Sequence, residues 1–130
     1  MTTTDTLLSR DMARVCEALS AVRAPAVPGE YDIHAMIAAA LNDAGLAFEH
    51  EFKLAPHCRI DFCVGRVGIE VKKGRPAASD LLRQLRRYLA SPALDGVIVV
   101  TQRALPLPEA IGGKPVRAIS LNRLWGVALP

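Results

Sequence analysis

The stretch RIDFCVGRVGIEVKKG, residues 59–74, alternates apolar and polar residues on both sides of a Gly-Arg pair at 65–66. Alternation with period two is typical of half-buried β-strands. A glycine as the first of two central residues suits a type II′ turn, because glycine tolerates the positive φ that this position requires. The stretch therefore predicts a β-hairpin, in which this turn pairs Val64 with Val67.

The polar positions of this hairpin hold Asp61, Glu70 and Lys72. A two-residue turn pairs Asp61 with Glu70, whereas a four-residue loop over 65–68 pairs Asp61 with Lys72. Both registers put the three side chains on one face of the sheet, since strand side chains alternate. The opposite face then takes the apolar residues Ile60, Phe62, Val64, Ile69 and Val71.

Two carboxylates directly across a strand pair repel each other and destabilise the sheet. A divalent cation between Asp61 and Glu70 would remove this repulsion, and Mg²⁺ is commonly held by one or two carboxylates together with water and phosphate oxygens. Lys72 would reach a metal-bound water or a phosphate from the same face. The three residues predict a site for phosphodiester hydrolysis. The alternative is a solvated polar strand face, in which Lys72 neutralises one of the acids.

The chain has 130 residues, of which 51% are hydrophobic, so it is long and apolar enough for one domain with a buried core. No apolar run approaches the roughly 20 residues of a membrane span, and the N-terminus lacks the basic-then-apolar order of a secretory signal. Three cysteines at no framework spacing favour reduced thiols. We therefore expect a cytoplasmic protein that does not act at a membrane.

Basic residues are concentrated in one part of the chain. Residues 59–87 hold eight Lys or Arg against three Asp or Glu, a local charge of +5 in a chain whose net charge is +3. Such a concentration favours a polyanionic partner such as nucleic acid. Charge alone, however, favours the alternative of a solvated surface.

Hydrophobic periodicity predicts an α/β protein with a mixed sheet and helices on both of its faces. Helices are predicted over 6–22, 30–44 and 80–90, with Ser79 as the N-cap of the last, and strands over 47–54, 59–64, 67–72, 96–101 and 116–119, followed by a short C-terminal helix. The strand at 67–72, the helix at 80–90 and the strand at 97–101 form a candidate βαβ crossover. We divide the single domain 1–130 into an N-terminal helix with a Pro/Gly linker (1–28) and a core with a C-terminal strand and helix (30–130).

The Asp61 position and the Glu70-Val71-Lys72 triplet on the next strand resemble the motif of the PD-(D/E)xK nucleases, the restriction-endonuclease-like superfamily. The order of elements from 30 to 101 matches the α-β-β-β-α-β core of that superfamily, although Ile60 stands where the motif has a nominal proline. The resemblance implies a Mg²⁺-dependent DNA nuclease without strong sequence specificity, in DNA processing, repair or recombination, with Mn²⁺ as a substitute metal. It implies that Asp61, Glu70 and the Val71 carbonyl hold the metal, and that Lys72 orients or activates the attacking water.

Gln84 and Tyr88 stand four apart in the predicted helix 80–90 and resemble the Gln-x-x-x-Tyr motif of the exonuclease-like branch of that superfamily. In that branch they would position the nucleic acid strand. The alternative is an ordinary boundary pair of an amphipathic helix. The candidate phosphate contacts are Lys73, Arg75, Arg83, Arg86 and Arg87.

The superfamily often adds an acid from the first core helix, and Glu30 is the best match, with Glu51 as the rival. His34 and His57 have no partner that the sequence identifies. DNA is expected ahead of RNA as the partner. Alternative functions are a junction-resolvase-like, structure-specific endonuclease, which would need a homodimer, a catalytically inactive nucleic-acid-binding module of the same fold, and a plain structural domain.

Overall fold

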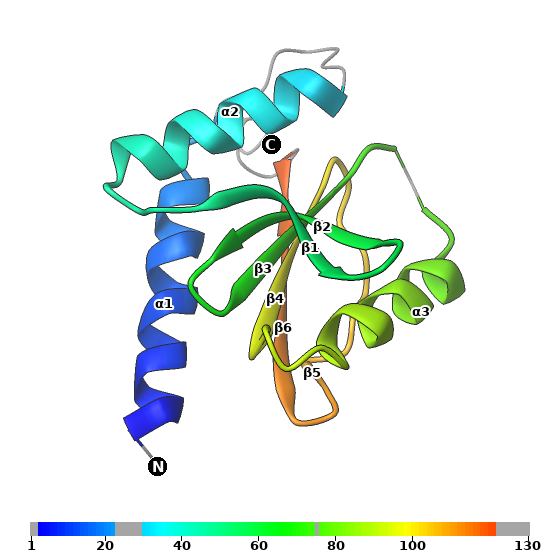
Figure 1. Ribbon diagram of the computed structural model, residues 1–130. Coiled ribbons are helices and arrows are strands. Elements are labelled where there is room, and N and C mark those ends of the chain that lie inside the picture. The colour runs from blue at the N-terminus through cyan, green and yellow to red at the C-terminus, as the bar shows by residue number, and fades with distance from the viewer. Residues whose placement is uncertain (1–2, 23–29, 75, 122–130) are drawn as a thin grey trace.

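The computed structural model of the protein describes residues 3–22, 30–74 and 76–121. The elements are the helices α1 (Thr3–Leu19), α2 (Glu30–Asp43) and α3 (Ala78–Leu89) and the strands β1 (Glu49–Ala55), β2 (Cys58–Val64), β3 (Val67–Lys72), β4 (Gly96–Thr101), β5 (Ala110–Ile111) and β6 (Lys114–Ser120) (Figure 1). The predicted α/β architecture and its α-β-β-β-α-β core are confirmed by the run from α2 to β4. The short strand β5 is an addition to the predicted elements, and the predicted C-terminal helix falls outside the described residues.

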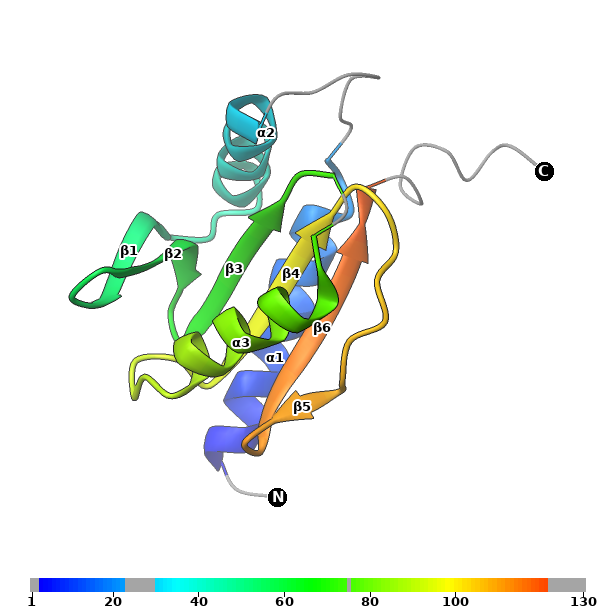
Figure 2. The same ribbon diagram turned by 90° about the vertical axis from the view of Figure 1, so that its right-hand side faces the viewer.

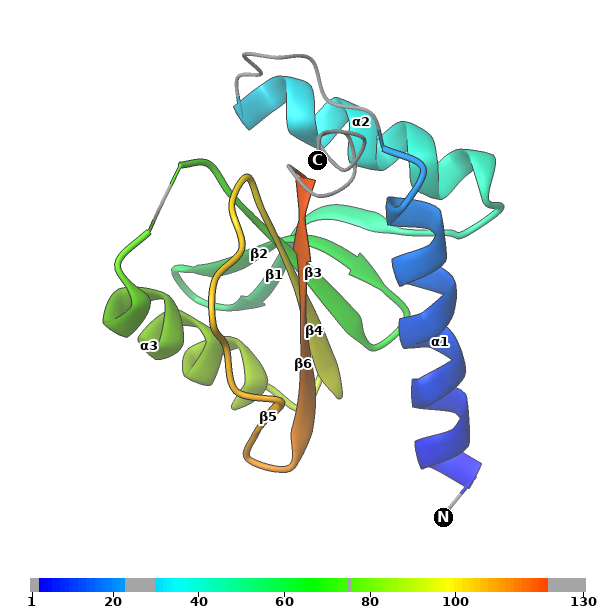
Figure 3. The ribbon, with the colours of Figure 1, turned by 180° about the vertical axis from the view of Figure 1, so that it is seen from behind.

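The strands form one mixed sheet in the order β1-β2-β3-β4-β6-β5. The first three strands form an antiparallel meander, and β3, β4 and β6 run parallel. Because β3 and β4 are parallel neighbours joined through α3, the predicted βαβ crossover is confirmed. Figure 2 shows α3 on one face of the sheet with α1 behind it, and Figure 3, seen from behind, shows α3 and α1 on opposite sides of the sheet.

Two layers of apolar side chains hold the helices to the sheet. On one face α1 and α2 contribute Met12, Val15, Leu19, Ile33, Ile37 and Leu41, which cluster with Phe62, Ile69, Val71, Ile98 and Val100. On the other face α3 contributes Leu81, Leu85, Tyr88 and Leu89, which cluster with Ile60, Val97 and Val99. Each buried Leu or Ile stabilises the fold by about 1.5–3 kcal/mol relative to an exposed one. We call these the α1/α2 cluster and the α3 cluster.

The end of α2 agrees with the prediction from the sequence, and the start of α3 does not. Gly45 ends α2 with a φ of 73°, and its N–H donates to the Asn42 carbonyl at 3.0 Å, as expected of a glycine after a helix. The prediction of Ser79 as the N-cap of α3 is wrong. Ala77 occupies that position and makes no side-chain cap, so Ser79 lies inside the first turn.

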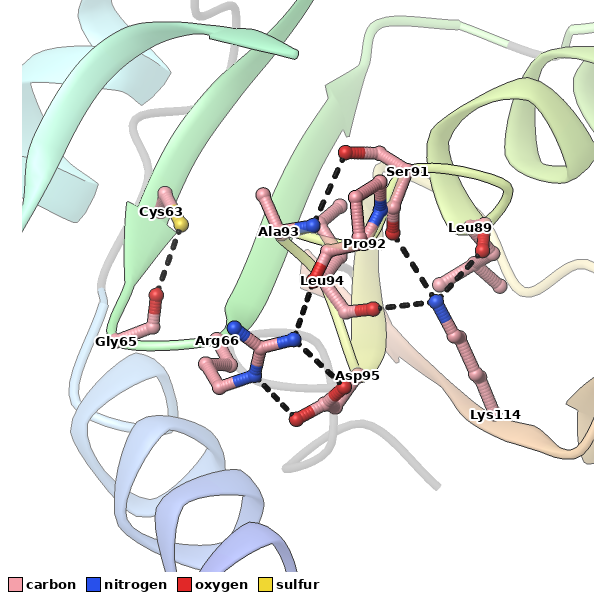
Figure 4. Close-up of polar contacts among 10 residues, drawn as sticks. All are labelled: Cys63, Gly65, Arg66, Leu89, Ser91, Pro92, Ala93, Leu94, Asp95 and Lys114. Atoms are coloured by element: carbon pink, nitrogen blue, oxygen red, sulfur yellow. Dashed lines mark hydrogen bonds and ion pairs between the residues drawn. The ribbon is translucent and has the colours of Figure 1, made fainter.

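The C-terminal end of α3 is held by Lys114 from β6 (Figure 4). The Lys114 ammonium donates to the carbonyls of Leu89, Ser91 and Leu94 at 2.8, 3.1 and 2.7 Å. A cation at this end also opposes the negative pole of the helix dipole. Lys114 therefore fixes the last turn of α3 relative to the sheet.

A second contact joins the β2–β3 turn to the loop that follows α3, residues 90–95. The Arg66 guanidinium pairs with the Asp95 carboxylate and also donates to the Pro92 carbonyl (Figure 4). The Asp95 N–H returns a hydrogen bond to the Arg66 carbonyl at 2.8 Å. The hairpin and the end of α3 are thus joined at the opposite end of β3 from Lys72.

Among the described residues, no helix combines the length and the apolar character that crossing a bilayer requires.

Candidate functional site

The β2–β3 hairpin has the register of a two-residue turn. Val64 pairs with Val67, Cys63 with Gly68 and Phe62 with Ile69. Gly65 has a φ of 59°, the positive value that the first position of a type II′ turn requires. The register that aligns Asp61 with Glu70 is therefore confirmed, and the four-residue loop is not.

Both β1 and β2 turn over at the level of Asp61. In a regular strand Ile60 and Phe62 would face one side, but Ile60 belongs to the α3 cluster and Phe62 to the α1/α2 cluster. Their partners are Phe52 and His50, and Glu51, the residue between these two, has a φ of 53°. The left-handed backbone at Glu51 turns the strand over, so that the side chains beyond it face the opposite sides of the sheet. We call this change of face the reversal. The prediction that Ile60 packs on the same face as Phe62 is wrong for this reason.

The reversal opens the ladder between β2 and β3, and side chains take over its hydrogen bonds. The Val71 N–H donates to Asp61 Oδ2 at 2.7 Å. The Asp61 N–H in turn lies 3.4 Å from Glu70 Oε1, which accepts from it. Each of the two carboxylates is therefore held by the backbone of the strand that carries the other.

Glu70 is buried, with only 4% of its surface exposed, and it faces the α3 side of the sheet. Lys72 follows on the same side, and its Nζ lies 3.1 Å from Glu70 Oε2. Asp61 lies at the reversal itself and extends into the opened ladder, so it reaches β3 without sharing that regular face. Burial, reinforced by the charge of Asp61 and opposed by Lys72, raises the pKa of Glu70 to about 7. A buried carboxylate of this kind costs stability and is characteristic of functional sites.

Tyr88 reaches this carboxylate from α3, and Gln84 contacts Tyr88. Tyr88 is buried, and Gln84 Nε2 donates to its hydroxyl oxygen at 2.7 Å. The pKa of Tyr88 is raised, first by burial and then by the charge of Glu70 and a side-chain interaction with it. The hydroxyl therefore keeps its proton and can donate it toward Glu70. Tyr88 lies within the α3 cluster, whereas Gln84 is half-buried and borders an open hollow of about 350 Å³ together with Lys72.

His34 and His50 belong to the same site, although neither has a role in the prediction from the sequence. His34 Nδ1 lies 3.0 Å from His50 Nε2, and His34 Nε2 lies 3.7 Å from Asp61 Oδ2. His34 is buried, and within the described residues its Nε2 has no hydrogen-bond partner. His50 also stacks on Phe62 at 4.7 Å between ring centroids. The one signal in the sequence is the position of His34 beside the buried stripe of α2.

The donor set suits a hard cation that keeps several waters. The described residues contain no group of three or more His, Cys, Asp or Glu side chains arranged to hold a metal ion. Asp61 and Glu70 supply two carboxylates, and Val71 adds a backbone carbonyl on the same strand as Glu70. Mg²⁺ requires no more protein ligands than this, because water and substrate phosphates complete its shell.

Two of the remaining predicted residues, Arg83 and Arg87, lie beside Lys72. Lys73, Arg83, Arg86 and Arg87 are exposed, and Arg83 and Arg87 border the same hollow as Lys72. Glu51 is exposed on the edge strand and pairs with Arg59 at 3.9 Å. The Arg75 residue and the Glu30 side chain lie outside the described part of the structure, so their roles stay predictions.

A separate hollow of about 590 Å³ lies between α1 and α2, with Ala18, Ala39 and Met36 in its walls. It has mainly small and apolar walls, and the carboxylates lie elsewhere, so it is not the candidate site. Comparison of the chain with protein families, with characterised proteins and with solved structures finds no match. Its function is therefore inferred from the cluster of Asp61, Glu70 and Lys72.

Proposed function

We propose that the chain is a Mg²⁺-dependent nuclease that hydrolyses phosphodiester bonds in DNA without strong sequence specificity. The observation that carries the proposal is the buried Glu70 carboxylate beside Asp61, with the Lys72 ammonium 3.1 Å away, where the β2–β3 ladder opens. A structural role does not account for a carboxylate that is buried next to a second one, because both burial and repulsion oppose its charge. A bound divalent cation accounts for both carboxylates.

In this proposal the Asp61 and Glu70 carboxylates and the Val71 carbonyl hold Mg²⁺. The ion, when bound, polarises the phosphate and lowers the pKa of a water molecule. Lys72 holds the attacking water beside Glu70 and stabilises the charge that develops on the phosphate. Tyr88, held by Gln84, fixes the orientation of Glu70, and His34 positions Asp61.

The resemblance to the PD-(D/E)xK nucleases supports this proposal. Asp61 lies on β2, and Glu70 and Lys72 lie on β3, which are the strands that the superfamily's motif requires. The α-β-β-β-α-β order of the elements also agrees with that superfamily. The Gln84–Tyr88 hydrogen bond favours the exonuclease-like branch, since the pair acts as one unit next to Glu70. Nucleic acid cleavage fits the basic hollow beside Lys72.

The test is cleavage of linear, circular and branched DNA by the purified chain, with Mg²⁺, with Mn²⁺ and with EDTA. Asp61→Asn and Glu70→Gln should each lower the rate by about 10²- to 10⁴-fold, and Lys72→Met by a comparable factor, because each removes a group that acts in the transition state. Glu17→Gln on the exposed surface of α1 is the control and should cleave as the wild type does. Wild-type cleavage rates in Asp61→Asn, or equal cleavage in EDTA, would refute the proposal.

A further inference from the structure

The β1–β2 hairpin exposes two cations directly across from each other. Lys53 pairs with Arg59, and both side chains lie in the solvent. Like charges at such positions destabilise a strand pair. Glu51 pairs with Arg59 at 3.9 Å, and both side chains of that ion pair are more than half exposed, so the pair contributes little. The two cations therefore repel each other, and an anionic partner would relieve that repulsion.

These cations border a hollow at the end of the hairpin. Lys53, Pro56, His57 and Arg59 line an open space of about 520 Å³. The turn residues Pro56 and His57 are themselves exposed. The hollow therefore combines positive charge with free access from solvent.

The hollow adjoins the basic surface of α3. An Arg87 guanidinium nitrogen donates to the His57 carbonyl at 3.3 Å, so this side chain lies against the hairpin turn. Arg87 also borders the hollow that contains Lys72, together with Arg83. Arg83 has Asp80 as an ion-pair partner at 3.5 Å, with both side chains largely exposed. Basic side chains thus continue from Lys72 along α3 to the tip of the hairpin.

The hairpin cations also lie close along β2 to the proposed catalytic carboxylate. Cys58 and Ile60 both belong to the α3 cluster, so the Arg59 side chain between them leaves β2 away from that cluster. Asp61 follows at the reversal and extends toward β3, so its side chain does not share a face with Arg59. Residues two apart on a strand are separated by about 6.6 Å along it, so Arg59 lies about one such step along β2 from the proposed site.

We propose that the β1–β2 hairpin is a nucleic-acid-binding arm for a DNA duplex. In this proposal Lys53 and Arg59 contact the phosphates next to the phosphate that lies at the proposed Asp61 site. The duplex follows from the shape of the arm, because a two-stranded β-ribbon fits the major groove, and the basic residues of α3 are placed to hold the backbone beside it. The inference rests on the proposed function for the identity of the polyanion. It adds the substrate class and a contact surface that the catalytic cluster does not contain.

The experiment is a fluorescence-anisotropy titration of a short labelled DNA duplex with the full chain in EDTA, repeated from about 50 to about 200 mM salt. If Lys53, Arg59, Arg83 and Arg87 each neutralise one phosphate, wild-type affinity should fall about 150-fold over that range. Lys53→Gln with Arg59→Gln removes two contacts, and the fall should shrink to about 12-fold. Arg10→Gln with Arg14→Gln on exposed α1, across the sheet from α3, removes the same charge and should leave the wild-type dependence unchanged.

The results separate the arm from general charge and from catalysis. Equal effects of the two double variants, or no binding of duplex by the wild type, would overturn the proposal. An equally large effect of the hairpin variant on a single strand of the same sequence would overturn the duplex assignment. A wild type that binds the duplex through the hairpin but does not cleave it in Mg²⁺ would refute the nuclease and leave the arm in place.

Discussion

Replacing Glu70 with Gln should stabilise the metal-free protein at neutral and alkaline pH. The folded protein raises the pKa of Glu70 from 4.5 to about 7 through burial and the charge of Asp61. Between these two values the folded chain holds a proton that the unfolded chain has released. The free energy of unfolding therefore falls as the pH rises through this window, and the loss is complete above about pH 7.

The size of the effect follows from the same difference. Each pKa unit corresponds to about 1.4 kcal/mol, so the charged Glu70 lowers the free energy of unfolding by about 3 kcal/mol at pH 8. The amide that Glu70→Gln introduces cannot ionise, yet its oxygen can still accept from the Asp61 N–H that Glu70 Oε1 accepts from. Lys72 loses its partner but stays hydrated, because a quarter of its side chain is exposed. We expect a net gain of about 2–3 kcal/mol for Glu70→Gln at pH 8.

The assay is urea unfolding in EDTA at a series of pH values from about 5 to about 8. The wild type should lose stability across this range relative to Glu70→Gln, and the exposed control Glu17→Gln should follow the wild type. Adding Mg²⁺ at pH 8 should stabilise the wild type, by about 2.7 kcal/mol at a hundredfold excess over Kd, and leave Glu70→Gln unaffected. Parallel pH profiles of the wild type and Glu70→Gln would show that folding does not raise the pKa of Glu70, and the reasoning would fail.

Three further changes test other parts of the structure. Lys114→Met should lower the free energy of unfolding by about 3 kcal/mol in the same urea assay, because it strips the carbonyls at the end of α3 of a charged donor; a loss as small as that of exposed Lys73→Met would contradict this. His57→Gly should raise the free energy of unfolding by about 0.5–1 kcal/mol, and with it the midpoint of thermal unfolding, because His57 holds a φ of 61° in the β1–β2 turn. An unchanged midpoint would show that no strain is stored there. Tyr88→Phe should slow cleavage about 10-fold with little loss of stability, because the hydroxyl that contacts Glu70 is removed while the ring still packs; unaltered kinetics would mean that α3 is only a scaffold.

The hairpin shows how far the sequence determines the site. Gly65 fixes the turn and the apolar pattern fixes the register, so the alignment of Asp61 with Glu70 follows from local rules that the structure obeys. The order of the elements follows as well, because each has a clear period and a clear stop. Strand β5 lacks such a signal, since a two-residue strand has no period to detect.

The reversal at Glu51 could not be predicted. Glutamate has no preference for the left-handed region, so nothing in the sequence marks the point where β1 and β2 turn over. That turn decides where Ile60 packs and opens the ladder at Asp61. The contact of His34 with His50 depends on how α2 lies on the sheet, which is a tertiary feature that no local pattern contains.

The position of Lys114 also sets an order of events during synthesis. The ribosome releases α3 before β6, and the carbonyls that Lys114 binds precede it by 20 to 25 residues. The last turn of α3, which carries Tyr88, is therefore fastened only after β6 has left the ribosome and joined the sheet. A nascent chain that ends before Lys114 carries Asp61, Glu70 and Lys72 but lacks the hydrogen bonds that fasten the end of the helix that supports Glu70. Completion of the proposed site is in this way coupled to completion of the sheet.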